Sequence, residues 1–234
     1  MTKIQLATSV TALAFGPDGT LFGLAPTEKK IVTIDAQGAT RPVATGIVGA
    51  QLVVTNSGTL FVSEPGEHTD QPSTLWQISP RGEKTVIDRG IRSASGVVFS
   101  PDGGLFFAAE KSSQWIYSFV VTDDGKFSHK QAYYWLHQPD IPNHSGAEAM
   151  AVDQKGNLYV ASAMGVQICD QNGRVRAILV PPTPSGPLRG ICFGGSQRDV
   201  LYVTDGIRVF KRPLRVQGQP AWAKPIPYAS QGQG

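Results

Sequence analysis

Residues 95–119 read SGVVFSPDGGLFFAAEKSSQWIYSF. Three apolar segments are separated here by the turn sequence Pro-Asp-Gly and by the polar sequence Lys-Ser-Ser-Gln. Short apolar segments bounded by Gly, Pro, Asp and Ser are typical of an antiparallel meander, because these residues adopt the backbone conformations that tight turns require. The stretch therefore predicts three consecutive strands joined by short connections.

The same unit recurs along the whole chain. Each copy has a leucine, followed by an aromatic residue, at the start of its second apolar segment: Leu21, Leu60, Leu105, Leu158 and Leu201. Consecutive leucines are 39, 45, 53 and 43 residues apart, which matches the period of a propeller blade. A single meander cannot bury both of its apolar faces, but radial stacking of several meanders can. We therefore predict an all-β fold, a β-propeller of four-stranded antiparallel blades with five repeats. An incomplete six-bladed propeller is the alternative.

We expect one domain over residues 1–234, with repeats at about 11–45, 46–88, 89–136, 145–180 and 186–218 and a C-terminal tail at 219–234. Residues 3–9 are expected to pair with the last blade and close the ring. Residues 214–218, LRVQG, are the expected fourth strand of that blade. Cys169 and Cys192 lie in apolar strands and are expected to be buried free thiols.

Composition excludes several classes of partner. The net charge is only +3, and no run of Lys or Arg could follow a phosphate backbone, so we expect no nucleic acid partner. No apolar run has the length of a membrane span, and the first ten residues lack the apolar core of a signal peptide. We expect a cytoplasmic protein by default. A periplasmic location and other domains as partners are expected if the chain is part of a longer protein.

The repeat alignment places one residue of each blade at the mouth of the central channel. These positions hold Thr11, Ala50, Ser95, Glu148 and Arg189. Glu64 and Asp205, at the ends of second strands, fall on the same face, where long loops also lie. A polar pocket of this kind suits a small polar ligand. The alternative is structural: Glu148 and Arg189 form an ion pair, and Thr11 and Ser95 bond to backbone groups.

Three stretches, residues 95–119, 146–175 and 190–204, resemble the regucalcin–gluconolactonase (senescence marker protein-like) family. The resemblance implies a six-bladed propeller that hydrolyses sugar lactones with one divalent metal, Ca, Zn or Mn, in its channel. The five repeats match the second to sixth blades of the family, so the blade that carries a glutamate ligand has no counterpart. Of the matched positions, Ser95 replaces a metal-binding asparagine, Glu148 replaces a metal-binding aspartate, and Ala50 replaces a substrate-binding asparagine.

Three interpretations follow. In the first, the chain is a gluconolactonase-like hydrolase of a sugar lactone or related small polar substrate. Glu148 is then the metal ligand or general base, Ser95 a further metal ligand or substrate contact, and Arg189, Thr11, Glu64 and Asp205 the remaining substrate-binding residues. In the second, it is a non-catalytic module of a larger bacterial protein that binds a carbohydrate or a protein partner and has lost the metal site. In the third, it is a remnant without a ligand. A Glu148 side chain with free oxygens would favour the first interpretation. A bonded Glu148–Arg189 pair beside a closed channel would favour the second interpretation, and an exposed apolar face would favour the third.

Overall fold

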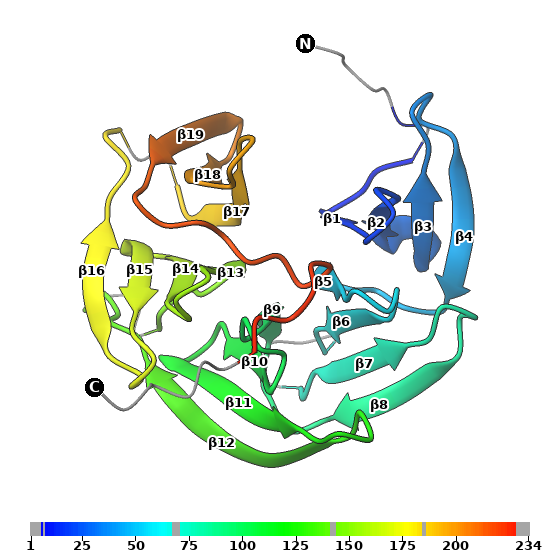
Figure 1. Ribbon diagram of the computed structural model, residues 1–234, viewed down its shortest axis with the longest axis horizontal. Helices are drawn as coiled ribbons and strands as arrows, with labels where there is room; N and C mark the ends of the chain where they lie inside the picture. Colours follow the sequence, from blue (N-terminus) through cyan, green and yellow to red (C-terminus); the bar gives the residue numbers. More distant parts are fainter. Residues whose placement is uncertain (1–5, 7, 67–70, 141–143, 184–185, 228–234) are drawn as a thin grey trace.

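The computed structural model describes residues 6, 8–66, 71–140, 144–183 and 186–227 and arranges them as five antiparallel sheets around a common axis (Figure 1). This confirms the predicted β-propeller of five repeats. Consecutive strands pair with one another in every sheet, so each sheet is a meander whose first strand lies nearest the axis. No helix in these ranges is long and apolar enough to cross a membrane.

The five sheets are called blades one to five in chain order. Blade one contains β1 (Ala12–Phe15), β2 (Leu21–Ala25), β3 (Lys30–Ile34) and β4 (Thr40–Thr45), with the short 3-10 helix η1 (Pro26–Glu28) after β2. Blade two contains β5 (Gln51–Val54), β6 (Leu60–Glu64), β7 (Thr74–Ile78) and β8 (Lys84–Asp88). Blade three contains β9 (Ala94–Phe99), β10 (Leu105–Glu110), β11 (Trp115–Val121) and β12 (Phe127–Trp135). Blade four contains β13 (Met150–Val152), β14 (Leu158–Ser162), β15 (Gly165–Cys169) and β16 (Val175–Leu179), and blade five contains β17 (Leu188–Gly194), β18 (Val200–Asp205) and β19 (Arg208–Pro213).

The turns between first and second strands lie on one face of the ring, called here the tight-turn face. In blade three, the amide of Gly103 donates to the carbonyl of Ser100 at 2.9 Å, and Gly103 has a φ of 75°. Gly58 closes the corresponding turn of blade two with a φ of 78°. Only glycine adopts such angles without a steric penalty, which explains why a glycine precedes the recurring leucine pattern. The first strands therefore run from the opposite face, where the predicted site lies, to these turns.

Apolar side chains fill the junctions between neighbouring blades. Leu24 and Leu52 belong to the cluster between blades one and two, and Phe61 and Phe106 to the cluster between blades two and three. Tyr134 and Leu158 join blades three and four, and Tyr159 and Leu201 join blades four and five. Among the described residues, four clusters thus connect five blades.

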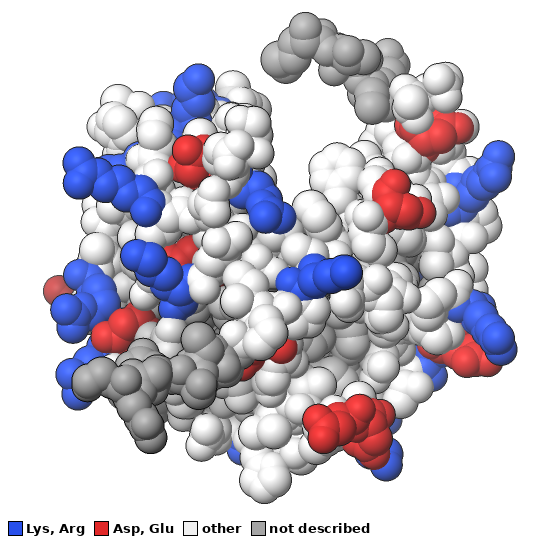
Figure 2. Space-filling model, in the orientation of Figure 1, with Lys and Arg blue, Asp and Glu red and all other residues white. Residues whose placement is uncertain are grey.

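Among the residues that the structure describes, the ring is open between blades five and one (Figures 1 and 2). On β1, Ala12 and Ala14 pack toward blade two, so the alternate residues Leu13 and Phe15 point to the open side, where each is 54% exposed. A cavity of 700 Å³ follows the axis and is lined by residues of both end blades, including Phe15 and Cys192. The strand expected from residues 3–9 falls mainly outside the described residues, and the described part of blade five has three strands.

The prediction of a fourth strand at residues 214–218 was wrong, because these residues do not pair with β19. After β19 the chain leaves blade five and crosses the tight-turn face toward blades two and three (Figure 1). The amide of Gly218 donates to the carbonyl of Arg198 at 2.8 Å, and the amide of Gln219 donates to the carbonyl of Val152 at 2.9 Å. A Cβ on Gly218 would lie 2.2 Å from the Cβ of Phe193, so this close crossing requires glycine.

Candidate active site

The predicted site residues lie at the end of the channel opposite the tight-turn face. Three of the aligned positions have the same backbone geometry. The amides of Thr11, Ala50 and Glu148 each donate to a carbonyl near the end of the second strand of their own blade, at 3.0, 2.7 and 2.9 Å. The repeat alignment therefore places equivalent residues at equivalent positions around the axis.

Glu148 lies at the centre of a charged cluster. Its Oε1 accepts hydrogen bonds from Nη1 of Arg189 at 2.6 Å and from Nζ of Lys111 at 2.5 Å. The Glu148 side chain is 15% exposed, whereas those of Lys111 and Arg189 are 40% and 58% exposed. Within the described part of the chain, both contacts use Oε1 and no hydrogen bond reaches Oε2. The mouth therefore holds one carboxylate with a free oxygen and two cations.

Lys111 was missed by the sequence alignment, although a signal for it was present. Glu110 ends the second strand of blade three, just as Glu64 and Asp205 end those of blades two and five. Lys111 is the next residue, so completing that column of the alignment would have placed it on the same face as Glu148. Its positive charge changes the electrostatics of the site, because the cluster now carries a net charge of +1 with both acid and bases ionised. Such a cluster can hold an anionic group or a developing oxyanion.

The acids at the ends of the second strands are engaged within the scaffold. Glu64 accepts from the Val48 amide and from the Trp76 indole, both at 2.6 Å. Glu110 accepts from the Arg92 amide at 3.0 Å and from the Ser113 hydroxyl at 2.7 Å. This geometry indicates that the two glutamates hold the loops entering and leaving their blades.

Asp205 behaves in the same way at the end of β18. Its side chain is fully buried and pairs with Nη2 of Arg208 at 3.0 Å. The structure thus places both acids at the ends of their second strands, with Glu64 bonded to Val48 and Trp76 and Asp205 paired with Arg208.

The hydroxyl positions of the ring differ in exposure. Ser95 is 3% exposed, and its hydroxyl donates to the carbonyl of Ala147 at 2.6 Å. Its own carbonyl accepts from the Ser63 hydroxyl at 2.5 Å, so Ser95 links blades two, three and four. Thr11 is exposed at the start of β1, beside the open side of the ring. Ser95 therefore holds the backbone just before Glu148, and Thr11 remains accessible from solvent.

The residues at the mouth do not fit a divalent metal. Hard cations such as calcium take six to eight oxygen ligands, usually including several carboxylates. Glu148 is the one carboxylate of the cluster, and two cations already contact it. The Ser95 hydroxyl donates its proton to a carbonyl, and the described residues contain no group of three His, Cys, Asp or Glu side chains that could hold a metal. The ligand positions expected from Glu148 and Ser95 therefore lack the companions that a metal needs.

Comparison with known proteins adds evidence of descent. The family model described as SMP-30/Gluconolactonase/LRE-like region matches residues 50–206. A pentonolactonase of Haloferax volcanii is 22% identical over 131 residues, which cover 56% of this chain and 44% of that protein. The chain thus spans less than half the length of this curated relative.

Solved structures show the same fold. A gluconolactonase of Xanthomonas campestris has a TM-score of 0.73 at 19% identity, covering 86% of this chain and 71% of that chain. A regucalcin of Agrobacterium tumefaciens, described as a calcium-binding protein, has a TM-score of 0.64 at 15% identity, covering 97% and 95%. Residues 111, 148 and 189 all fall within the stretch that the family model matches.

Proposed function

Because the chain belongs to the SMP-30/gluconolactonase/LRE-like family, we propose that it is a lactone hydrolase of the gluconolactonase type. Its substrate is a sugar lactone or a related small polar compound bound at the channel mouth. The observation that carries this proposal is the Glu148 cluster, where a carboxylate with one free oxygen lies between two cations. Hydrolysis of an ester needs a base for water and positive groups for an oxyanion, and the cluster contains both.

The geometry supports the following roles for the site residues. Glu148 Oε1 is held by Lys111 and Arg189, which leaves Oε2 to accept a proton from a water molecule. That water attacks the lactone carbonyl, a new C–O bond forms, and the carbonyl oxygen becomes an oxyanion that the cations stabilise. Collapse of this intermediate breaks the ring C–O bond, and the proton passes from Glu148 to the departing oxygen. The product is an open-chain hydroxy acid.

Arg189 is the cation best placed to bind the negative charge that develops on the substrate during hydrolysis. More than half of its side chain is exposed, so its guanidinium can move from Glu148 to the substrate without disturbing a packed neighbour. A guanidinium also matches a carboxylate with two parallel hydrogen bonds, which suits the acid product. Thr11 is the accessible hydroxyl of the ring and is proposed as a contact to the sugar.

The apolar channel below the mouth limits where a polar substrate can lie. The cavity reaches Ala149, the residue after Glu148, but its walls are mainly apolar and include Val98, Met150 and Ile191. A sugar lactone buried there would lose hydrogen bonds to water without replacing them. We therefore place the substrate at the mouth, above the apolar part of the channel.

The test is hydrolysis of glucono- and pentonolactones, measured as acid release above the spontaneous rate. We expect Glu148→Gln to lower kcat/KM by about 100-fold or more, because it removes the base but keeps the shape. Arg189→Gln should lower it by about tenfold to 100-fold. Glu83→Gln, which changes an exposed carboxylate far from the mouth, is the matched control and should be unchanged. Thermal unfolding shows that each variant is folded.

Two outcomes would contradict the proposal. Acid release no faster than the spontaneous rate, across all lactones, would leave Glu148 and its cations as structure in a binding propeller. A fully active Glu148→Gln variant would remove the proposed base. The same assay with a chelator tests the metal separately, and we expect activity to persist because the mouth lacks a metal ligand set.

A further inference from the structure

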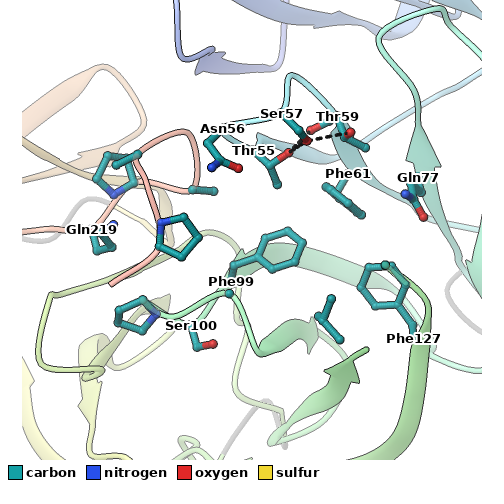
Figure 3. A pocket seen from close by; sticks show the side chains of 18 residues that line it. Thr55, Asn56, Ser57, Thr59, Phe61, Gln77, Phe99, Ser100, Phe127 and Gln219 are labelled. Carbon is teal, nitrogen blue, oxygen red and sulfur yellow. Dashed lines mark hydrogen bonds between the residues drawn. The ribbon is translucent and has the colours of Figure 1, made fainter. Parts of the chain in front are cut away.

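A second cavity lies on the tight-turn face, between blades two and three and the C-terminal tail (Figure 3). Its volume is 240 Å³. Phe99 ends β9 on this face, whereas Ser95 of the same strand holds the backbone just before Glu148, so the two sites are separated by about 13 Å of extended chain. The cavity is therefore independent of the proposed active site.

The floor of the cavity is aromatic. The rings of Phe61 and Phe99 are 4.8 Å apart in an edge-to-face arrangement, and those of Phe61 and Phe127 are 5.7 Å apart in the same arrangement. Phe61 and Phe99 belong to the packed cluster between blades two and three, which fixes their orientation. An aromatic ring that enters the cavity could pack against these phenylalanines edge to face or offset-stacked, the two arrangements that aromatic rings favour.

The rim is polar but carries no charge. The hydroxyls of Thr55, Ser57 and Thr59 form a chain, with oxygen–oxygen distances of 2.9 and 3.1 Å (Figure 3). The amides of Asn56 and Gln77 also lie at the edge. None of the 18 lining residues is Lys, Arg, Asp, Glu or His. An ion entering this cavity would lose hydration without finding a counter-charge, so the site favours an uncharged molecule.

The tail forms a fixed wall. The amide of Ile226 donates to the carbonyl of Pro101 at 2.8 Å, and the Gln219 amide donates to the carbonyl of Val152 at 2.9 Å. Between these anchors, the side chain of Gln219 donates to the carbonyl of Lys224 at 2.9 Å. Pro220 and Pro225, with few accessible backbone angles, line the cavity. A wall held at both ends is preformed, so little ordering is needed when a ligand binds.

We propose that this cavity binds a small uncharged aromatic compound that carries one or two hydroxyl or amide groups. The aromatic ring packs on Phe61, Phe99 and Phe127, and the polar group meets the hydroxyl chain of the rim. A cavity of 150 Å³ already holds benzene, so 240 Å³ suits one ring with a short substituent. The ligand differs in charge and chemistry from the sugar lactone proposed at the opposite face.

The experiment is a calorimetric titration with p-cresol, whose ring and hydroxyl match the cavity, and with benzoate, which has a similar ring but a negative charge. We expect one p-cresol to bind per chain with a Kd of about 0.1–1 mM, in the range open to so small a ligand. Benzoate should bind at least about tenfold more weakly, because the rim offers no cation.

Variants locate the binding. Ala223→Phe should fill the cavity from the tail and weaken p-cresol binding at least about tenfold. The matched control, Lys224→Phe, adds the same ring at a neighbouring exposed position outside the lining and should bind like the parent. Ser57→Phe closes the cavity from the opposite rim, so the test remains decisive if one filling variant unfolds. Absence of saturable binding, or binding that survives both filling variants, would overturn the proposal. The proposal of lactone hydrolysis at the opposite face does not depend on whether p-cresol binds.

Discussion

The two cysteines differ in burial because they lie at different positions in the ring of blades. Cys169 is fully buried in the cluster between blades three and four, and burial raises the pKa of its thiol to about 12. Cys192 pairs with Tyr202 across β17 and β18, on the open side of the ring, and is exposed. The expectation of two buried thiols was therefore wrong for Cys192, because no blade covers that side among the described residues.

We predict that a thiol reagent labels Cys192 alone in the native protein and both cysteines in denaturant. Partial burial also raises the pKa of Cys192, so its reactive thiolate is scarce at neutral pH. The labelling rate should rise roughly tenfold per pH unit while the pH stays below that pKa. Cys192→Ser should abolish native labelling. Equal labelling of both thiols in the native protein would show that the third and fourth blades open easily.

At the candidate site, the sequence predicted which side chains meet, Glu148 and Arg189, better than it predicted the bonds of the other candidate residues. Glu148 and Arg189 could be paired in advance because the repeat gives each residue a defined position around the axis. Lys111 was not predicted: its position after Glu110 would have placed it on the same face, but its contact with Glu148 is made by a long side chain that extends from a loop. The backbone bond of Ser95 was one of the two alternatives considered from the sequence, and the structure contains it. The bonds of Glu64 to Val48 and Trp76 depend on a neighbouring loop and strand, and single-residue patterns do not encode such contacts.

At the scale of the element, the turn after β13 depends on one buried acid. Asp153 is fully buried, and its Oδ1 accepts from the amides of Lys155 and Asn157 at 2.9 and 3.0 Å. Its Oδ2 accepts from the Asn157 side chain at 2.8 Å and from the Tyr159 hydroxyl at 3.1 Å. Burial, followed by the charge of Asp153, raises the pKa of Tyr159, which keeps that hydroxyl protonated as a donor.

We predict that Asp153→Ala lowers the free energy of unfolding by about 3 kcal/mol, because it leaves several buried donors without an acceptor. Urea unfolding measures this loss. Asp35→Ala is the matched control: Asp35 also accepts from two backbone amides, those of Gln37 and Ala39, but it is exposed. Its removal should cost clearly less, because water can replace the lost acceptor. Equal losses in the two variants would mean that burial of Asp153 adds nothing.

The strands themselves differ in how well sequence predicts them. The inner strands are apolar and bounded by turns, so the repeat defined them. Outer strands are mostly exposed, as in β8 (Lys84–Asp88), and carry a weak apolar signal. Residues 214–218 resemble an outer strand for this reason, yet Leu214 and Val216 pack against the cluster of blades four and five instead. Whether such a segment pairs with a sheet edge or packs on an apolar cluster depends on its tertiary contacts, so the local sequence does not predict it.

At the scale of the whole molecule, the open ring is the feature that the repeat count alone could not decide. Five repeats were compatible with a closed ring or with an incomplete one, and the difference lies in the angle between successive blades. Within the described ranges no blade packs against β1 on its open side, and about half of the surface of Leu13 and Phe15 contacts solvent. An apolar strip of this kind joins the channel cavity, which both end blades line.

We predict that this strip binds a fluorescent apolar dye such as anilinonaphthalene sulfonate in the native protein. The double variant Leu13→Ser/Phe15→Ser should reduce the dye signal and lower the free energy of unfolding by only about 1 kcal/mol per site, because about half of each side chain is already in water. Leu52→Ser, at a 4% exposed position between blades one and two, is the control. It should cost about 3 kcal/mol or more and leave the strip intact. A large loss of stability in the double variant, with unchanged dye binding, would mean that the two side chains are packed in solution and that the ring closes over them.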